Sequence, residues 1–136
     1  YRRVLLPQIR AEAELAHEHG AKFGYICSSG TKPMLDDYLE AGIDVLIGVD
    51  PIQGTHTNLP LMKEKLNHRV CLWGGVSGAI TVEQGSEVEV RSAVREAQQT
   101  LGSNGFILSP VDNLTVDEPR TWTNVKILID EWNRVR

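Results

Sequence analysis

The sequence predicts an α/β protein made of repeated strand–helix units around a parallel sheet, and three observations support this. Four short apolar runs alternate with longer segments of helical periodicity. Each apolar run ends in small or polar residues, as strands of parallel sheets do at the edge where ligands bind. Strands joined by helices of this length favour right-handed crossovers. No linker or low-complexity tract interrupts the pattern, so residues 1–136 are expected to form a single domain.

The chain begins with a helix, and the strand–helix unit then follows four times. Residues 5–19 place apolar side chains on one helical face, and Gly20 is a typical helix stop. Ser86 and Glu89 form a capping box before the most clearly amphipathic segment. Strands are predicted at residues 23–27, 43–49, 70–73 and 105–108. The helices that follow them are predicted to begin near Thr31, Asn58, Ser86 and Pro119, the last with Trp122 and Ile129 facing inward.

Two architectures fit this order. One is half of an eight-stranded (β/α)8 barrel, whose full form needs roughly 250 residues. The other is an open, doubly wound four-stranded sheet. In both, the loops after the strands lie at one edge, and residues 74–78 are predicted to be one of these glycine-rich loops, with a short extra strand at 80–82. Periodicity alone leaves both architectures open.

Composition narrows the function classes. The formal net charge is −4 and there is no dense basic stripe, which argues against a nucleic-acid partner. No apolar run approaches the roughly 20 residues that span a bilayer, so no membrane association is expected. The two cysteines are expected to be free thiols in a reducing cytoplasm. The chain starts without Met in what looks like mid-domain sequence, which favours a fragment of a longer enzyme.

Several side chains at the loop edge could carry chemistry. Ser28 and Ser29 precede a helix whose backbone N–H groups could bind a carboxylate or another anion. Asp50 and Asp112 each follow a strand and could act as general acid or base, or hold a cationic ring nitrogen. Ordinary turn and capping chemistry explains the same residues equally well.

Cys27 could be a metal ligand or a thiolate nucleophile, although a free cysteine is more often a small buried apolar residue. Tyr25 precedes it on the same strand, and both are expected to form part of a ligand-binding wall. His56 could be a ligand or a proton shuttle, and Ser77 belongs to the glycine-rich segment where a ligand can approach the backbone. No complete zinc-binding or nucleotide-binding spacing is present in the sequence.

The four segments FGYICSSGT, YLEAGIDVLIGVDP, LWGGVSG and EVRSAVREAQQTLGSNGFILSP occur in this order. Together they resemble the C-terminal half of the uroporphyrinogen decarboxylase superfamily, which includes decarboxylases of haem biosynthesis and cobalamin-dependent methyltransferases. The resemblance covers nearly the whole chain. It implies a half-barrel with its site at the carboxyl end of the strands. Where zinc methyltransferases of the group carry H-x-C, this chain has Tyr25-Ile26-Cys27, and its last strand ends with Asp112 instead of a Cys.

The resemblance implies a parent carboxy-lyase or methyltransferase that acts on a tetrapyrrole carboxylate or transfers a methyl group with a corrinoid protein. Asp112 and Cys27 are then the catalytic candidates, with Tyr25, Ser28, Ser29, Asp50, His56 and Ser77 around the substrate. Zinc, with Cys27 as a ligand, or a corrinoid would be the cofactor. A half-barrel alone is expected to be inactive and to self-associate or pair with an N-terminal half. The alternative from a different class is a non-catalytic binding module.

Overall fold

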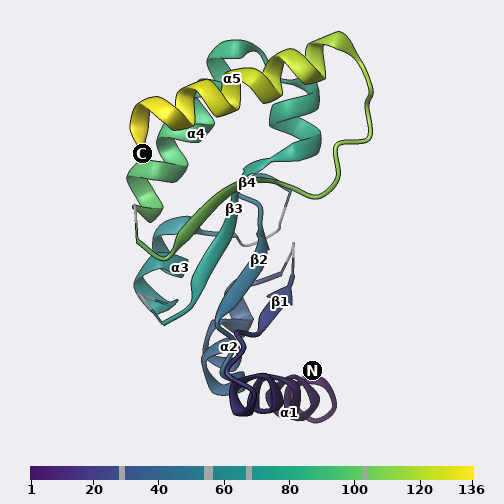
Figure 1. Cartoon of the computed structure of the whole chain (residues 1–136), viewed down its shortest axis with the longest axis vertical. Helices are drawn as coiled ribbons and strands as arrows, with labels where there is room; N and C mark the ends of the chain where they lie inside the picture. The colour runs from purple at the N-terminus through teal and green to yellow at the C-terminus, as the bar shows by residue number, and fades with distance from the viewer. Residues whose placement is uncertain (28–29, 54–56, 67–68, 103) are drawn as a thin grey trace.

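In the part of the chain that the structure describes, four parallel strands form one open sheet at the centre of the molecule (Figure 1). A computed structural model describes residues 1–27, 30–53, 57–66, 69–102 and 104–136. The strands are β1 (Gly24–Ile26), β2 (Val45–Val49), β3 (Cys71–Ser77) and β4 (Phe106–Val111). The helices are α1 (Leu5–Glu18), α2 (Leu35–Ala41), α3 (Leu59–Leu66), α4 (Glu87–Leu101) and α5 (Pro119–Val135). Strands alternate with helices, so the predicted α/β fold is confirmed.

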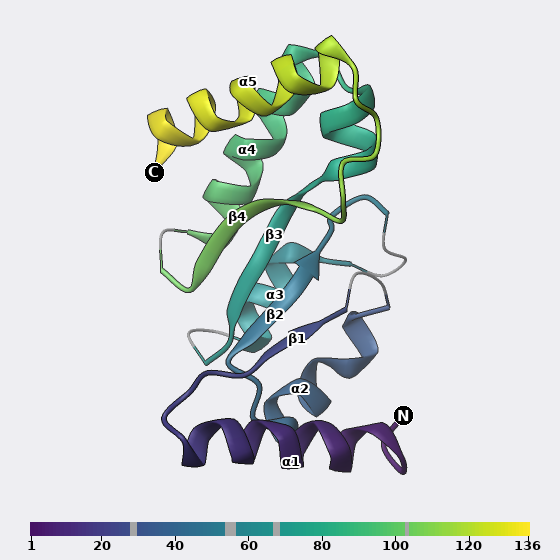
Figure 2. The ribbon, with the colours of Figure 1, turned by 45° about the vertical axis from the view of Figure 1, so that its right-hand side comes forward.

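The strand order in the sheet is β1-β2-β3-β4, the same as the order in the chain. Each neighbouring pair is parallel. A doubly wound sheet needs a reversal of strand order at a switch point, and the described strands contain none. Consecutive order places successive right-handed crossovers on the same face of the sheet, as in one wall of a barrel. The sheet itself is open, with β1 and β4 at its edges (Figure 2).

The two faces of the sheet differ in what covers them. Alternate side chains of a strand point to opposite faces, so residues in register across the sheet share one face. One such row packs against the helices in the main core and consists of Tyr25, Leu46, Leu72 and Phe106. The next row lies on the opposite face, and we call it the open-face row: Ile26, Ile47, Trp73 and Ile107. Three of its members are more than a third exposed, led by Ile26 at 71%.

Helix α5 packs on α4 at one end of the molecule (Figures 1 and 2). The buried carboxylate of Glu131 on α5 accepts hydrogen bonds from Arg91 at 2.8 Å and Arg95 at 2.7 Å on α4. The prediction that Trp122 and Ile129 face inward is wrong, since they are 56% and 52% exposed. Val125, Leu128 and Trp132 were predicted to face inward as well, and these three do pack in the core.

Two strands continue beyond their predicted ends. Gly74 and Gly75 belong to β3 and not to a loop, and residues 109–111 belong to β4. Both glycines have positive φ, and a Cβ on Gly75 would lie 2.9 Å from the ring of Phe106. Glycine here permits close packing of the backbone instead of marking a turn. The extra strand predicted at 80–82 is also wrong, because Gly78–Val82 forms a short π-helix.

The helix starts were predicted with mixed success. Asn58 caps α3 by accepting a hydrogen bond from the Leu61 N–H at 2.9 Å. Ser86 and Glu89 form the predicted capping box of α4. Thr31 does not cap a helix, because its buried hydroxyl points to the Met62 sulfur at 3.8 Å. No helix within the described ranges has the length and apolar character to cross a bilayer.

Asp44, between α2 and β2, is expected to make stability depend on pH. Burial would raise the pKa of its carboxyl group, but hydrogen bonds from Lys22, the Phe23 N–H and His17 outweigh this and lower the pKa to about 2. A lowered pKa in the folded state means stability that is present above the ordinary Asp pKa and is lost as pH falls toward 2. Asp44→Asn is therefore expected to cost on the order of 1 kcal/mol at pH 7.

Urea denaturation of the wild type and Asp44→Asn between pH 2 and 7 measures this contribution. The difference between the two proteins should shrink below pH 4. The control is Asp36→Asn, because Asp36 is 72% exposed and pairs with Lys65 at the surface. A difference that stays constant down to pH 2 contradicts the assignment.

Candidate functional site

The open face of the sheet carries a pocket of about 640 Å³ near the carboxyl ends of β1, β2 and β4. Ile26 is the last residue of β1, Ser109 to Val111 are the last residues of β4, and Asp112 follows directly after that strand. Eleven of the described residues line the pocket: Ile26, Ile47, Gly48, Trp73, Gly74, Ser109, Pro110, Val111, Asp112, Asn113 and Thr115. Ligands in parallel α/β folds bind at this end of the strands. This pocket is the candidate functional site.

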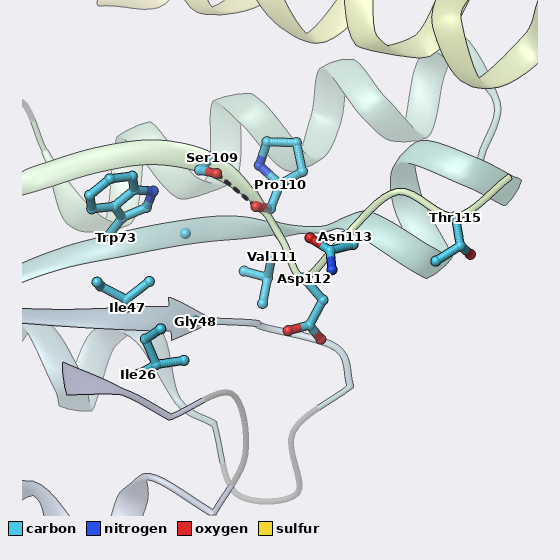
Figure 3. A pocket seen from close by; sticks show the side chains of 11 residues that line it. Ile26, Ile47, Gly48, Trp73, Ser109, Pro110, Val111, Asp112, Asn113 and Thr115 are labelled. Carbon is cyan, nitrogen blue, oxygen red and sulfur yellow. Dashed lines mark hydrogen bonds between the residues drawn. The ribbon is translucent and has the colours of Figure 1, made fainter. Parts of the chain in front are cut away.

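One side of the pocket is apolar. Trp73, Ile47 and Ile26 are adjacent members of the open-face row and lie together at one end of the pocket (Figure 3). The indole of Trp73 is 39% exposed, although a tryptophan on a strand usually belongs to the core. An exposed aromatic next to two isoleucines offers a ligand a large apolar surface with little conformational entropy to lose.

The other end of the pocket is polar and comes from the loop after β4, with Asp112, Asn113 and Thr115 (Figure 3). Asp112 alone among non-glycine residues in the described part of the chain has a positive φ, at 64°. Aspartate tolerates this left-handed conformation better than most residues. Asn113 follows it, and the Ser109 hydroxyl donates a hydrogen bond to the Pro110 carbonyl at 2.7 Å. Asp112 is the one charged side chain among the described lining residues.

Glu83, just after the π-helix, holds the loop that follows Asp112. Its buried carboxylate accepts hydrogen bonds from the N–H of Thr115 and from the N–H of Val116, the latter at 3.0 Å. The Thr115 hydroxyl donates to the same oxygen at 3.3 Å. The Thr115 N–H, followed by that of Val116, lowers the pKa of Glu83. This carboxylate therefore fixes one wall of the pocket without lining it.

Glu83→Gln is expected to loosen this loop, because a neutral amide accepts weaker hydrogen bonds than a carboxylate. Amide hydrogen exchange at Thr115 and Val116 should become about tenfold faster. Protection in the wild type should persist at neutral pH and fall only in acid, since the pKa of Glu83 is lowered. The control is Glu87→Gln, because Glu87 is 57% exposed and pairs with Arg91 on α4. Equal exchange in both variants contradicts the role of Glu83.

Tyr25 and Cys27, both predicted to line the site, lie away from the pocket. Both pack against the core between sheet and helices. The Tyr25 ring lies 5.9 Å from the Tyr38 ring. Burial, followed by a hydrogen bond with the Cys27 side chain, raises the pKa of Tyr38. Among the described residues no three His, Cys, Asp or Glu side chains gather as a metal site, so no step is assigned to zinc.

Asp50 and Ser77 form a separate polar group beside the pocket. Asp50 is 1% exposed, and its Oδ1 accepts hydrogen bonds from the N–H groups of Ile52 at 2.7 Å and Gln53 at 2.9 Å. The Gln53 side chain donates to the Ser77 hydroxyl at 3.3 Å. Asp50 therefore makes the turn after β2, which was the alternative explanation for it. Neither residue lines the pocket.

Ser28, Ser29 and His56, the other predicted site residues, lie outside the described residues. Of the described candidates, the structure brings only Asp112 into the pocket. Trp73, Ile47 and Ile26 were not predicted as site residues. The alternation of side chains along each strand is the sequence signal that could have identified them, because each of the three is next to a core residue on its strand. An apolar side chain on a strand nevertheless indicates burial until the face that it occupies is known.

Comparison with known proteins is informative about the fold. No protein-family model matches the chain, and no curated protein matches it. The fold is similar to that of a methyltransferase from Methanosarcina mazei. The TM-score is 0.74 at 22% sequence identity, over 98% of this chain. This chain spans 36% of the length of that protein. At this level of identity the likeness establishes the shared α/β fold.

Proposed function

We propose that this chain is the ligand-binding half of a methyl-transfer enzyme that works with a corrinoid partner. The observation that carries the proposal is the pocket on the open sheet face, with its apolar side at Trp73 and its carboxylate at Asp112. The fold shared with a methyltransferase supports the same activity. The remaining wall of the barrel would come from another part of the parent protein, since β1 and β4 are free edges.

The pocket chemistry favours methyl transfer over decarboxylation of a tetrapyrrole carboxylate. A substrate with several carboxylates needs cationic partners, usually Arg or Lys. None of the described residues that line the pocket is Lys, Arg or His. The charge that the pocket presents is negative and belongs to Asp112. A polycarboxylate would be repelled here, whereas a neutral or cationic methyl carrier would not.

Each side of the pocket has a role in this proposal. The surface of Trp73, Ile47 and Ile26 binds the compound that carries the methyl group, and it excludes water from one side of that group. The Asp112 carboxylate orients the polar end of the carrier, and the left-handed backbone at this position is a strain that Glu83 helps to maintain through the following loop. Glu83 thus acts on the ligand through the loop and not by contact.

The test is binding by equilibrium dialysis of the 136-residue chain with methylcobalamin and, separately, with uroporphyrin. We expect methylcobalamin to bind and uroporphyrin not to bind. Trp73→Ala should weaken the binding of methylcobalamin, while Trp122→Ala, which removes a 56% exposed indole on α5, should not. Binding of uroporphyrin without methylcobalamin would establish the decarboxylase alternative and overturn the proposal.

The non-catalytic alternative is favoured by one observation, the exposure of the open-face row. An apolar face with free edges can associate with a second copy or with the other half of a barrel. Sedimentation of the chain at several concentrations distinguishes the two functions. A stable oligomer that binds neither ligand supports an interaction module.

A further inference from the structure

We propose that the methyl carrier recognised by this pocket is an onium compound, a quaternary ammonium or sulfonium ion. The inference rests on the proposed methyl-transfer function and adds the substrate class. Three features of the pocket carry it: an exposed indole, a carboxylate at the opposite end of the pocket, and the absence of positive charge among the described lining residues.

The indole comes first. A methylated cation placed over an aromatic face within about 6 Å is attracted by the ring, and tryptophan is the strongest of the aromatic side chains in this respect. Trp73 presents 39% of its surface, and its neighbours across the sheet in the same row are Ile47 and Ile107. The methyl groups of an onium ion suit this apolar surrounding, while its charge is spread over those methyl groups and needs no hydrogen-bond acceptor.

The carboxylate adds the charge. Asp112 lies at the far end of the pocket from Trp73, with Val111 between them (Figure 3). No Lys, Arg or His side chain in the described part of the chain forms a salt bridge with the Asp112 carboxylate. The Ser109 hydroxyl already donates its proton to the Pro110 carbonyl, so it can offer a ligand only its lone pairs. The Asn113 amide and the Trp73 indole N–H can donate, but the only charge among the described lining residues is negative, which suits a cation.

Onium ions also suit the reaction. When the acceptor attacks the methyl carbon, the new bond forms from the acceptor's lone pair. The C–N or C–S bond breaks with its electron pair going to nitrogen or sulfur. The amine or sulfide then leaves uncharged, and no proton is needed at the leaving atom. A reduced corrinoid on the partner would supply the lone pair that accepts the methyl group. A pocket that lacks a general acid beside Trp73 can therefore still support the transfer.

The test compares two molecules of the same shape, choline and 3,3-dimethylbutan-1-ol, in which carbon replaces the charged nitrogen. Each is titrated into the 136-residue chain, and binding is followed by the backbone amide NMR signals of the residues that line the pocket, which remain observable when Trp73 is replaced. We expect choline to bind about 5- to 30-fold more tightly at low salt. The preference should narrow at 1 M salt, where exposed charges are screened.

Three variants test which residues produce the preference for choline over the alcohol. Asp112→Asn keeps the local backbone tendency and should lower choline affinity without changing the affinity for the alcohol. Trp73→Leu keeps an apolar surface and should remove most of the preference for choline. Trp122→Leu is the matched control and should bind as the wild type does. Circular dichroism of each variant confirms that it is folded.

Equal affinity for choline and the alcohol overturns this inference, as does a preference that survives in both Asp112→Asn and Trp73→Leu. If methylcobalamin binds while choline is not preferred, only the substrate class is wrong. If uroporphyrin binds in place of methylcobalamin, the proposed function itself is wrong. The choline titration therefore tests the substrate class, whereas the methylcobalamin and uroporphyrin measurements test the proposed function.

Discussion

Replacing Gly74 with alanine is expected to destabilise the chain by about 2–5 kcal/mol, because strand β3 has no room for a side chain at this position. A Cβ there would lie 2.6 Å from the carbonyl oxygen of Val49 and 2.8 Å from its nitrogen. Both contacts are with backbone, so no side-chain rotation relieves them. The φ of Gly74 is +144°, which L-residues rarely adopt. Strands β2 and β3 would have to separate, and the pocket, which Gly74 lines, would change shape.

The matched control is Gly105→Ala, at the residue before β4. Gly105 also has positive φ, at +70°, but a Cβ there would meet no atom within 4 Å. The free energy of unfolding of this variant is expected to fall by only about 1–2 kcal/mol, which is the cost of an alanine in the left-handed conformation. Urea denaturation followed by circular dichroism measures both. Equal losses in the two variants would show that close packing at Gly74 contributes nothing beyond backbone conformation.

Gly74 also shows why the sequence predicts the fold well but predicts the ends of the strands less well. Alternating apolar and helical segments define βα units, because those periodicities arise from local geometry. The glycines after Trp73 indicate a loop by the same local logic. In the structure the register between β2 and β3 shifts at this point, and Val49 pairs with Gly74. That close approach joins residues far apart in sequence, so no local pattern reveals it.

The candidate site shows a similar division. Asp112 was predicted because a polar residue after a strand is typical of ligand-binding loops. Tyr25 and Cys27 were expected beside it, but strand parity turns both toward the core and leaves Ile26, between them, on the open face. Trp73 was missed because its exposure depends on which face the helices cover. The handedness of the strand–helix–strand connections along the whole chain determines which face the helices cover.

The second prediction compares neighbouring residues of β2 that face opposite sides of the sheet. Leu46 is fully buried against the helices, and Leu46→Ala is expected to cost about 2–5 kcal/mol. Ile47 is half-buried on the open face, so Ile47→Ala is expected to cost about 1 kcal/mol when nothing covers that face. Thermal unfolding at several protein concentrations measures the losses in both variants.

Concentration is the informative variable. If the open-face row pairs with a second copy, the melting temperature of the wild type should rise with protein concentration, by mass action. Ile47→Ala should then flatten this dependence, because it removes apolar surface from the interface. Leu46→Ala should lower the melting temperature by a similar amount at every concentration, because its contacts lie within one chain. An Ile47→Ala loss as large as that of Leu46→Ala at every concentration would mean that the open face is covered within the monomer, and the pocket would then be closed to a ligand.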